Sequence, residues 1–208
     1  MYFIGIDQSL TNTGVCVLRY NPGISTHFLG SFKSKPIKTP GATRSTLDLL
    51  KLRRIDTIVD DVMSQLKKLD ISEPPFVAIE SPSFSVQNVD LSILYGKMAD
   101  RLWDWMYECP PDVSGIDQVI IVMPTELKSF VTGKGNADKD AMVFATSVRD
   151  HNQADAFGLA TLALFMKTGV IHPCYKQGSE AHLKKLAQAR NRIREHLTSP
   201  YIKKKKWP

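Results

Sequence analysis

The apolar residues of this chain fall into short runs with a strand-like pattern near the start and into longer helical patterns further on. Three apolar segments, 2–8, 13–20 and 26–33, are separated by short polar turns, and Asn21-Pro22-Gly23 is a strong turn signal. Strands this close in sequence pair with one another as an antiparallel meander. We therefore predict three antiparallel strands at the beginning of the fold.

The rest of the chain alternates helical and strand patterns. Segments with helical apolar spacing are predicted helices, and they cover about 47–66, 90–107, 125–131, from 137 onward, 152–167 and 179–197. Two further apolar runs, 76–80 and a fully buried 119–122, are predicted strands. This order predicts an α/β fold with a mixed five-stranded sheet, helices on both of its faces and a basic C-terminal helix or tail.

Size and composition favour one domain with an appendage. The chain has 208 residues, of which 43% are hydrophobic, so it can build a sizeable core. The longest apolar run, 156–166, is too short to cross a bilayer, and the first residues do not resemble a signal peptide. Cys16, Cys109 and Cys174 are scattered and not spaced as a zinc site. A cytoplasmic protein with no membrane partner is the expectation.

The positive charge is concentrated at the C-terminal end. Residues 176–208 carry ten Lys or Arg against two acids, whereas the whole chain has a net charge of only +6. A near-neutral body, 1–173, with a basic extension, 174–208, suggests a polyanionic partner, most simply nucleic acid. Two other interpretations stay open: a solubilising end, or a helix packed on the body with a solvated basic face that includes Lys184 and Lys185.

Three acids share one sequence context, because each interrupts or ends an apolar element. Asp7 lies in the first strand, Glu80 ends the fourth, and Asp155 is expected in the first turn of the helix 152–167, among small residues that let the helix approach the sheet. If the first and fourth strands are neighbours, the three carboxylates converge. Three oxygen ligands without a His/Cys cluster suit Mg²⁺ or Mn²⁺. The alternative for Asp7 is an ordinary surface acid.

Four motifs in this order resemble those of the RuvC-type Holliday-junction resolvases, within the ribonuclease H-like superfamily. The first is Ile4-Gly5-Ile6-Asp7-Gln8-Ser9-Leu10-Thr11-Asn12-Thr13-Gly14, and the second is Ala78-Ile79-Glu80. Lys128, followed by the segment from Gly133 to Lys139, resembles the lysine-bearing loop and helix of these enzymes, and Ala154-Asp155-Ala156 resembles their last acidic motif. The resemblance covers roughly residues 1–168.

The resemblance implies a nuclease domain over 1–173 that cuts four-way DNA junctions as a homodimer. It makes Asp7, Glu80 and Asp155 metal ligands for Mg²⁺, with Mn²⁺ able to substitute, and two such ions would hydrolyse a phosphodiester bond. DNA contacts would come from an aromatic and from basic residues: Phe84, Lys128, Lys134, Lys139, Lys184 and Lys185. Phe84 can equally be a hydrophobic loop anchor, and a lysine can be an ordinary solvated side chain.

One departure from the resembling motifs concerns the fourth metal ligand. The family usually has an acid or histidine three residues before the last aspartate, where this chain has Asn152. Asn152 and His151 precede Asp155 by three and four residues, so either side chain can share its helix face. An amide oxygen binds Mg²⁺ without contributing charge, so the second metal site is expected to be weaker if Asn152 fills it. His151 can also be a helix-entry residue with no ligand role.

Three other functions compete with junction resolution. A ribonuclease H-like nuclease acting on RNA or RNA–DNA hybrids would use the same acids. A junction-binding protein with weakened catalysis is suggested only by Asn152. An actin-like or sugar-kinase-like ATPase also has a Gly-Ile-Asp hairpin, but such proteins clasp the nucleotide between two domains of this kind, for which 208 residues are too few.

Overall fold

The computed structural model describes residues 1–35, 39–71, 73–82, 88–107, 118–175 and 188. Within these residues, five strands form one mixed sheet in the order β3-β2-β1-β4-β5. The strands are β1 (Tyr2–Asp7), β2 (Asn12–Tyr20), β3 (Ile24–Lys33), β4 (Phe76–Glu80) and β5 (Val119–Val122). The first three are antiparallel, whereas β4 pairs parallel with both β1 and β5. The predicted mixed sheet is confirmed.

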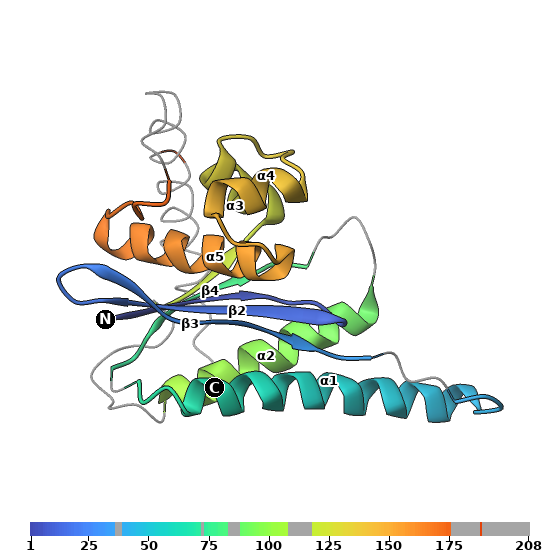
Figure 1. Ribbon diagram of the computed structural model, residues 1–208. Coiled ribbons are helices and arrows are strands. Elements are labelled where there is room, and N and C mark those ends of the chain that lie inside the picture. Colours follow the sequence, from blue (N-terminus) through green and yellow to red (C-terminus); the bar gives the residue numbers. More distant parts are fainter. Residues whose placement is uncertain (36–38, 72, 83–87, 108–117, 176–187, 189–208) are drawn as a thin grey trace, which may run out of the picture.

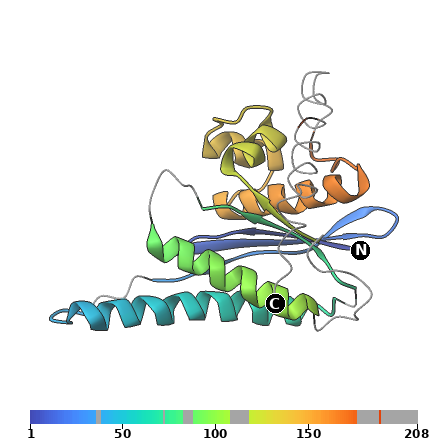
Figure 2. The same cartoon turned by 180° about the vertical axis from the view of Figure 1, so that it is seen from behind.

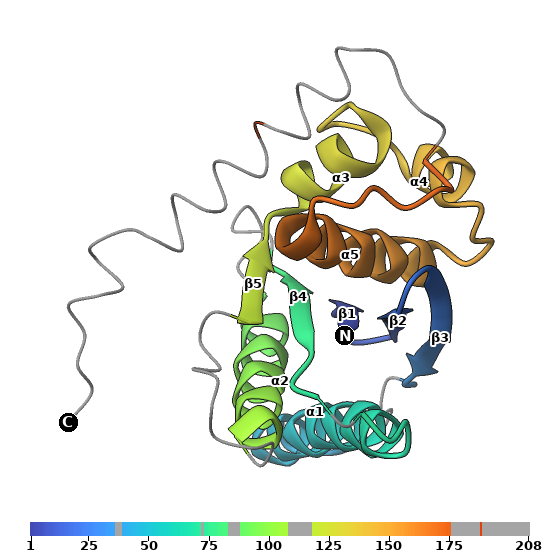
Figure 3. The same cartoon turned by 90° about the vertical axis from the view of Figure 1, so that its left-hand side faces the viewer.

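Helices cover both faces of the sheet, as predicted. They are α1 (Arg44–Lys67), α2 (Val89–Tyr107), α3 (Pro124–Thr132), α4 (Lys139–Thr146) and α5 (His151–Thr168). Figure 1 shows α1 and α2 together below the sheet, with α5 on the opposite face and α3 and α4 beyond it. The view from behind shows the same layers (Figure 2), and the view along the strands shows β1 at the centre of the sheet (Figure 3).

The alternation of side chains along the strands creates one core on each face. Phe3 and Ala78 belong to the core under α5, which also contains the buried face of α3. Ile4, Ile6 and Ile79 belong to the second core, under α1 and α2. The strand residues of odd number in β1 and of even number in β4 therefore face α5.

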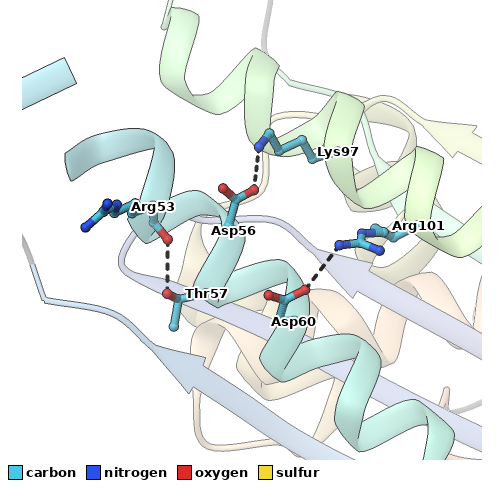
Figure 4. A network of polar contacts seen from close by, with 6 residues as sticks. All are labelled: Arg53, Asp56, Thr57, Asp60, Lys97 and Arg101. Atoms are coloured by element: carbon cyan, nitrogen blue, oxygen red, sulfur yellow. Dashed lines mark hydrogen bonds and ion pairs between the residues drawn. The ribbon is translucent and has the colours of Figure 1, made fainter. Parts of the chain in front are cut away.

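Ion pairs on the surface link α1 to α2. Asp56 binds Lys97, and Asp60 lies 3.6 Å from Arg101 (Figure 4). These side chains are well exposed, and such pairs contribute on the order of 1 kcal/mol or less each. The helices are held mainly by the apolar side chains that they bury against the sheet.

One sequence prediction needs correction, and two others concern residues outside the described ones. The strand β5 is not fully buried, because it is the last strand of the sheet and Ile121, which points away from α5, remains 55% exposed. The predicted C-terminal helix, with Lys184 and Lys185, and the loop residue Phe84 lie outside the described residues. Among the described helices, none has the length and hydropathy of a membrane span.

Candidate active site

Two acidic side chains stand next to each other where the central strands end. Asp7 is the last residue of β1 and Glu80 is the last residue of β4. The two strands are parallel and adjacent, with Ile6 opposite Ile79, so the next pair along is Asp7 and Glu80. Alternation places both side chains on the face that α5 covers. The first and fourth strands are therefore neighbours, which is the condition that the sequence analysis set for the carboxylates to converge.

Two glycines in the sheet bring α5 close to this edge. A Cβ atom on Gly5 would lie 2.0 Å from the carbonyl oxygen of Ala156, and one on Gly14 would lie 2.1 Å from that of Asn152. Gly14 is the β2 residue paired with Asp7. Because neither glycine has a side chain, the first two turns of α5 rest directly on the backbone beside Asp7.

The approach of α5 was predicted from small residues on the helix, which is only partly right. Ala156 does lie on the sheet, against Gly5. Gly158 instead faces α3, where an added Cβ would lie 2.8 Å from Val131 and 3.1 Å from Leu127. Because α3 packs closely on α5, Lys128 of α3 lies on the side of the molecule where Glu80 and Asp155 are found.

The prediction that Asp155 lies in the first turn of its helix is wrong. Asp150 caps α5 by accepting a hydrogen bond from the Gln153 amide at 3.0 Å, so the helix begins at His151 and Asp155 is its fifth residue. The favourable field of a helix N-terminus falls off within the first turn. The charge on Asp155 must therefore be compensated by other groups.

The Asp7 carboxyl is buried and interacts directly with Glu80. Burial, then the negative charge of Glu80 and a hydrogen bond to it, raise the pKa of Asp7 well above its usual value of 3.8. Burial also raises the pKa of Glu80, although the hydrogen bond from Asp7 and the positive charge of Lys128 act in the opposite direction. Both directions fit a protonated Asp7 that donates to the Glu80 carboxylate.

Asp155 belongs to the same electrostatic cluster. Burial and the negative charge of Glu80 raise its pKa from 3.8 to about 6, while Lys128, Lys139 and His151 lower it. Lys128 lies in α3, and Lys139 is the first residue of α4, directly after the N-cap Asp138. The three acids, from β1, β4 and α5, thus share one electrostatic environment with two lysines, from α3 and α4.

The donor set is suited to a divalent cation. Among the described residues, no three His, Cys, Asp or Glu side chains are oriented to hold one ion as they stand. However, Asp7 is buried and Glu80 and Asp155 are half-buried, and their raised pKa values record first the cost of burying a negative charge and then, for Asp7 and Asp155, repulsion by neighbouring carboxylates. A hard divalent cation prefers carboxylate oxygens and would remove this repulsion. These three residues are therefore the candidate ligands.

The remaining predicted site residues differ in how far the structure describes them. His151 lies near Asp155 and has a buried Nδ1 atom to which no described residue is hydrogen-bonded. The carbonyl oxygen of Asn152 lies against Gly14. Lys134 is exposed in the connection from α3 to α4. Phe84, Lys184 and Lys185 lie outside the described residues.

Sequence reasoning missed Gln8, the residue directly after Asp7. Its side chain is buried, and neither amide atom has a hydrogen-bond partner among the described residues. It lines a pocket next to Glu80. The sequence feature that could have identified Gln8 is a large polar residue at the end of an otherwise apolar strand, where the chain turns away from the sheet.

Comparison with known proteins identifies the fold. No protein-family model and no curated protein matches the sequence. Among solved structures, Thermus thermophilus RuvC matches with a TM-score of 0.56 and 19% identity, over 81% of this chain and 97% of that chain. T. thermophilus RuvC in complex with a Holliday junction substrate matches with a TM-score of 0.53 and 19% identity, over 81% and 96%. The chain has the RuvC-type fold, which confirms the predicted ribonuclease H-like class.

Proposed function

We propose that this protein is a divalent-metal-dependent endonuclease that cuts four-way and other branched DNA junctions. The observation that carries the proposal is the cluster of Asp7, Glu80 and Asp155, with Lys128 and Lys139 beside it. T. thermophilus RuvC, which has the same fold, has been solved in complex with a Holliday junction, and this is the class of substrate proposed here. Mg²⁺ is the proposed cofactor, with Mn²⁺ as a substitute.

The three carboxylates would hold the metal. Two bound divalent cations supply a nucleophilic water at neutral pH and stabilise the leaving oxygen of a phosphodiester. Asn152 or His151 would complete the ligand set from the first turn of α5. Their proximity to Asp155 supports either residue, and the unpartnered Nδ1 atom favours His151.

The lysines would bind the DNA backbone. Lys128 and Lys139 come from two different helices and both act electrostatically on Asp155, so a phosphate held between them would lie at the edge of the cluster. Lys134 is exposed on the connection between these helices and would extend the contact. The basic extension 174–208 would add phosphate contacts, and Phe84 would meet bases near the junction centre.

A homodimer is proposed because cutting a two-fold symmetric junction requires two active sites. Apolar side chains remain exposed at one end of the α1–α2 layer, where Lys51 of α1 lies 3.6 Å from Asp90 of α2. Leu49 and Val89 are 63% and 67% exposed there. These two side chains mark the surface that we propose for the interface. Light scattering should give twice the 23.3 kDa of one chain, and a mass of 23.3 kDa would contradict the dimer.

Incubation with end-labelled substrates tests the proposed activity. A four-way junction, a flap, a linear duplex and an RNA–DNA hybrid are each mixed with the protein in Mg²⁺, Mn²⁺ or EDTA, and the nicks are mapped. We expect paired nicks near the centre of the four-way junction, in the two metal solutions only. Preferred cleavage of the hybrid would favour the ribonuclease H alternative. Junction binding without cleavage in either metal would favour a binding protein.

A further inference from the structure

A pocket lies beside the acid cluster, at the end of the sheet and against α2. It has a volume of about 170 Å³ and is lined by Gln8, Glu80, Ser81, Pro82, Leu91, Tyr95 and Pro124. Sites for whole drug-sized ligands usually measure about 300–1,000 Å³. This pocket therefore suits one ring system, and Glu80 places it in direct contact with the metal-ligand cluster.

The Gln8 amide is the unusual group in this pocket. Its side chain is 8% exposed, and within the part of the chain that the structure describes both its nitrogen and its oxygen lack a hydrogen-bond partner. Buried polar groups are almost always paired, because an unpaired one loses its hydration without compensation. A ligand with both a donor and an acceptor on one edge has the groups that would pair with both atoms of this amide.

The other walls of the pocket narrow the chemical class of ligand. Pro82, Leu91 and Pro124 are apolar, and Tyr95 adds a half-buried aromatic ring. The lining contains a carboxylate, Glu80, and no basic side chain, so it disfavours a phosphate or another anion. A ligand that fits these walls has flat apolar faces and carries a donor and an acceptor along one edge. A nucleobase has these properties.

We propose that this pocket holds the base of a nucleotide next to the phosphodiester bond that is cut, and that the Gln8 amide reads this base. The inference rests on the proposed junction cleavage and deepens it by assigning a residue that determines sequence preference. A glutamine amide pairs best with the adjacent acceptor and donor of adenine, so adenine is the expected base. Gln8 is thus a specificity-determining residue, distinct from the metal ligands.

Cleavage of a junction library with randomised central base pairs tests this inference. The wild-type protein is incubated with the library in Mg²⁺, and the cut products are sequenced. We expect adenine to be favoured at one fixed distance from the nick by roughly 5- to 150-fold, the discrimination of one good bidentate pair. Gln8→Leu should lose the preference at that position alone.

A second buried glutamine provides the matched control. Gln118 is 5% exposed, has an unpartnered Oε1 atom, and precedes β5 at the end of the sheet opposite Glu80. Gln118→Leu should keep the wild-type preference. If Gln8→Leu does not fold, wild-type protein with junctions that carry adenine analogues, each lacking one hydrogen-bonding group, still tests the contact. A junction with such an analogue at the preferred position should then be cut more slowly than one with adenine there.

The outcomes separate this inference from the proposed function. Wild-type cleavage without any base preference would overturn the inference while leaving junction cleavage intact. The inference would also be overturned if Gln8→Leu kept the wild-type base preference, or if no adenine analogue slowed cleavage. Absence of cleavage on every member of the library, in Mg²⁺ and in Mn²⁺, would instead overturn the proposed function.

Discussion

Replacing Asp155 by asparagine should stabilise the metal-free protein while removing its activity. The pKa of Asp155 is raised from 3.8 to about 6 by burial and by Glu80. Between these two pH values the folded state binds more protons than the unfolded state, so its stability falls as pH rises and then stays level above about 6. Asparagine carries no charge at any of these pH values and escapes this cost.

The size of the effect follows from the shift in pKa. A rise from 3.8 to about 6 corresponds to about 3 kcal/mol, since one pKa unit is about 1.4 kcal/mol. Solvent screening of this partly exposed side chain brings the figure toward about 2 kcal/mol. For a chain of this length, the midpoint of thermal unfolding should rise by roughly 4–8 °C.

Thermal unfolding at several pH values in EDTA measures this stabilisation. Asp155→Asn should unfold at higher temperature than the wild type at pH 8, and the difference should shrink as pH falls toward 4. Mg²⁺ should narrow the difference at pH 8, because the wild type gains binding free energy that the variant loses. The control is Asp150→Asn, the same substitution at the N-cap of α5, where both residues cap equally well.

A wild-type protein as stable as Asp155→Asn at pH 8 in EDTA would refute the electrostatic reasoning. So would a difference that does not change with pH, because it would come from packing rather than from charge. An equal gain in Asp150→Asn would show that any lost negative charge near α5 has the same effect, and that Asp155 has no special environment.

Three further predictions concern packing, the fourth ligand and DNA binding. Gly14→Ala should destabilise the fold by about 1–3 kcal/mol, because its Cβ would lie 2.1 Å from a carbonyl oxygen of α5. Gly96→Ala, whose Cβ would have no described atom within 4 Å, should instead stabilise α2 by roughly 0.5–1 kcal/mol. Denaturant unfolding compares the two variants, and equal effects on stability would contradict the close approach of α5 to Gly14. His151→Ala should raise the Mg²⁺ concentration needed for cleavage more than Asn152→Ala does, and the reverse order would assign the fourth ligand to the amide. Lys128→Gln should weaken junction binding and lower the slope of log K against log salt concentration by about 0.9, and an unchanged slope would remove Lys128 from the phosphate contacts.

The sequence was sufficient to predict the order of elements and the place of the acids. Short apolar runs in 2–8 and 76–80 and helical spacing in 152–167 are local signals, and they place Asp7 and Glu80 at strand ends and Asp155 near the start of a helix. The short turns between the first three strands required an antiparallel meander. Adjacency of the first and fourth strands was a condition of the site, and the sheet order confirms it.

The sequence was insufficient where the result depends on which elements meet. The exposure of Ile121 follows from the edge position of β5, which local hydrophobicity does not encode. The close approach of α5 depends on Gly5 and Gly14 in the sheet, and not only on small residues in the helix. The pocket at Gln8 brings together residues from four separate parts of the chain, so no local pattern predicts it.

The most direct test of the central claim is a crystal of the protein soaked with Mn²⁺, examined at a wavelength where manganese scatters anomalously. If Asp7, Glu80 and Asp155 form a cation site, an anomalous peak will lie among their carboxylate oxygens at distances typical of metal coordination, and Asp155→Asn will weaken or abolish it. The absence of a peak at that position would contradict this site. So would a peak from manganese bound elsewhere, at a place that the substitution does not affect.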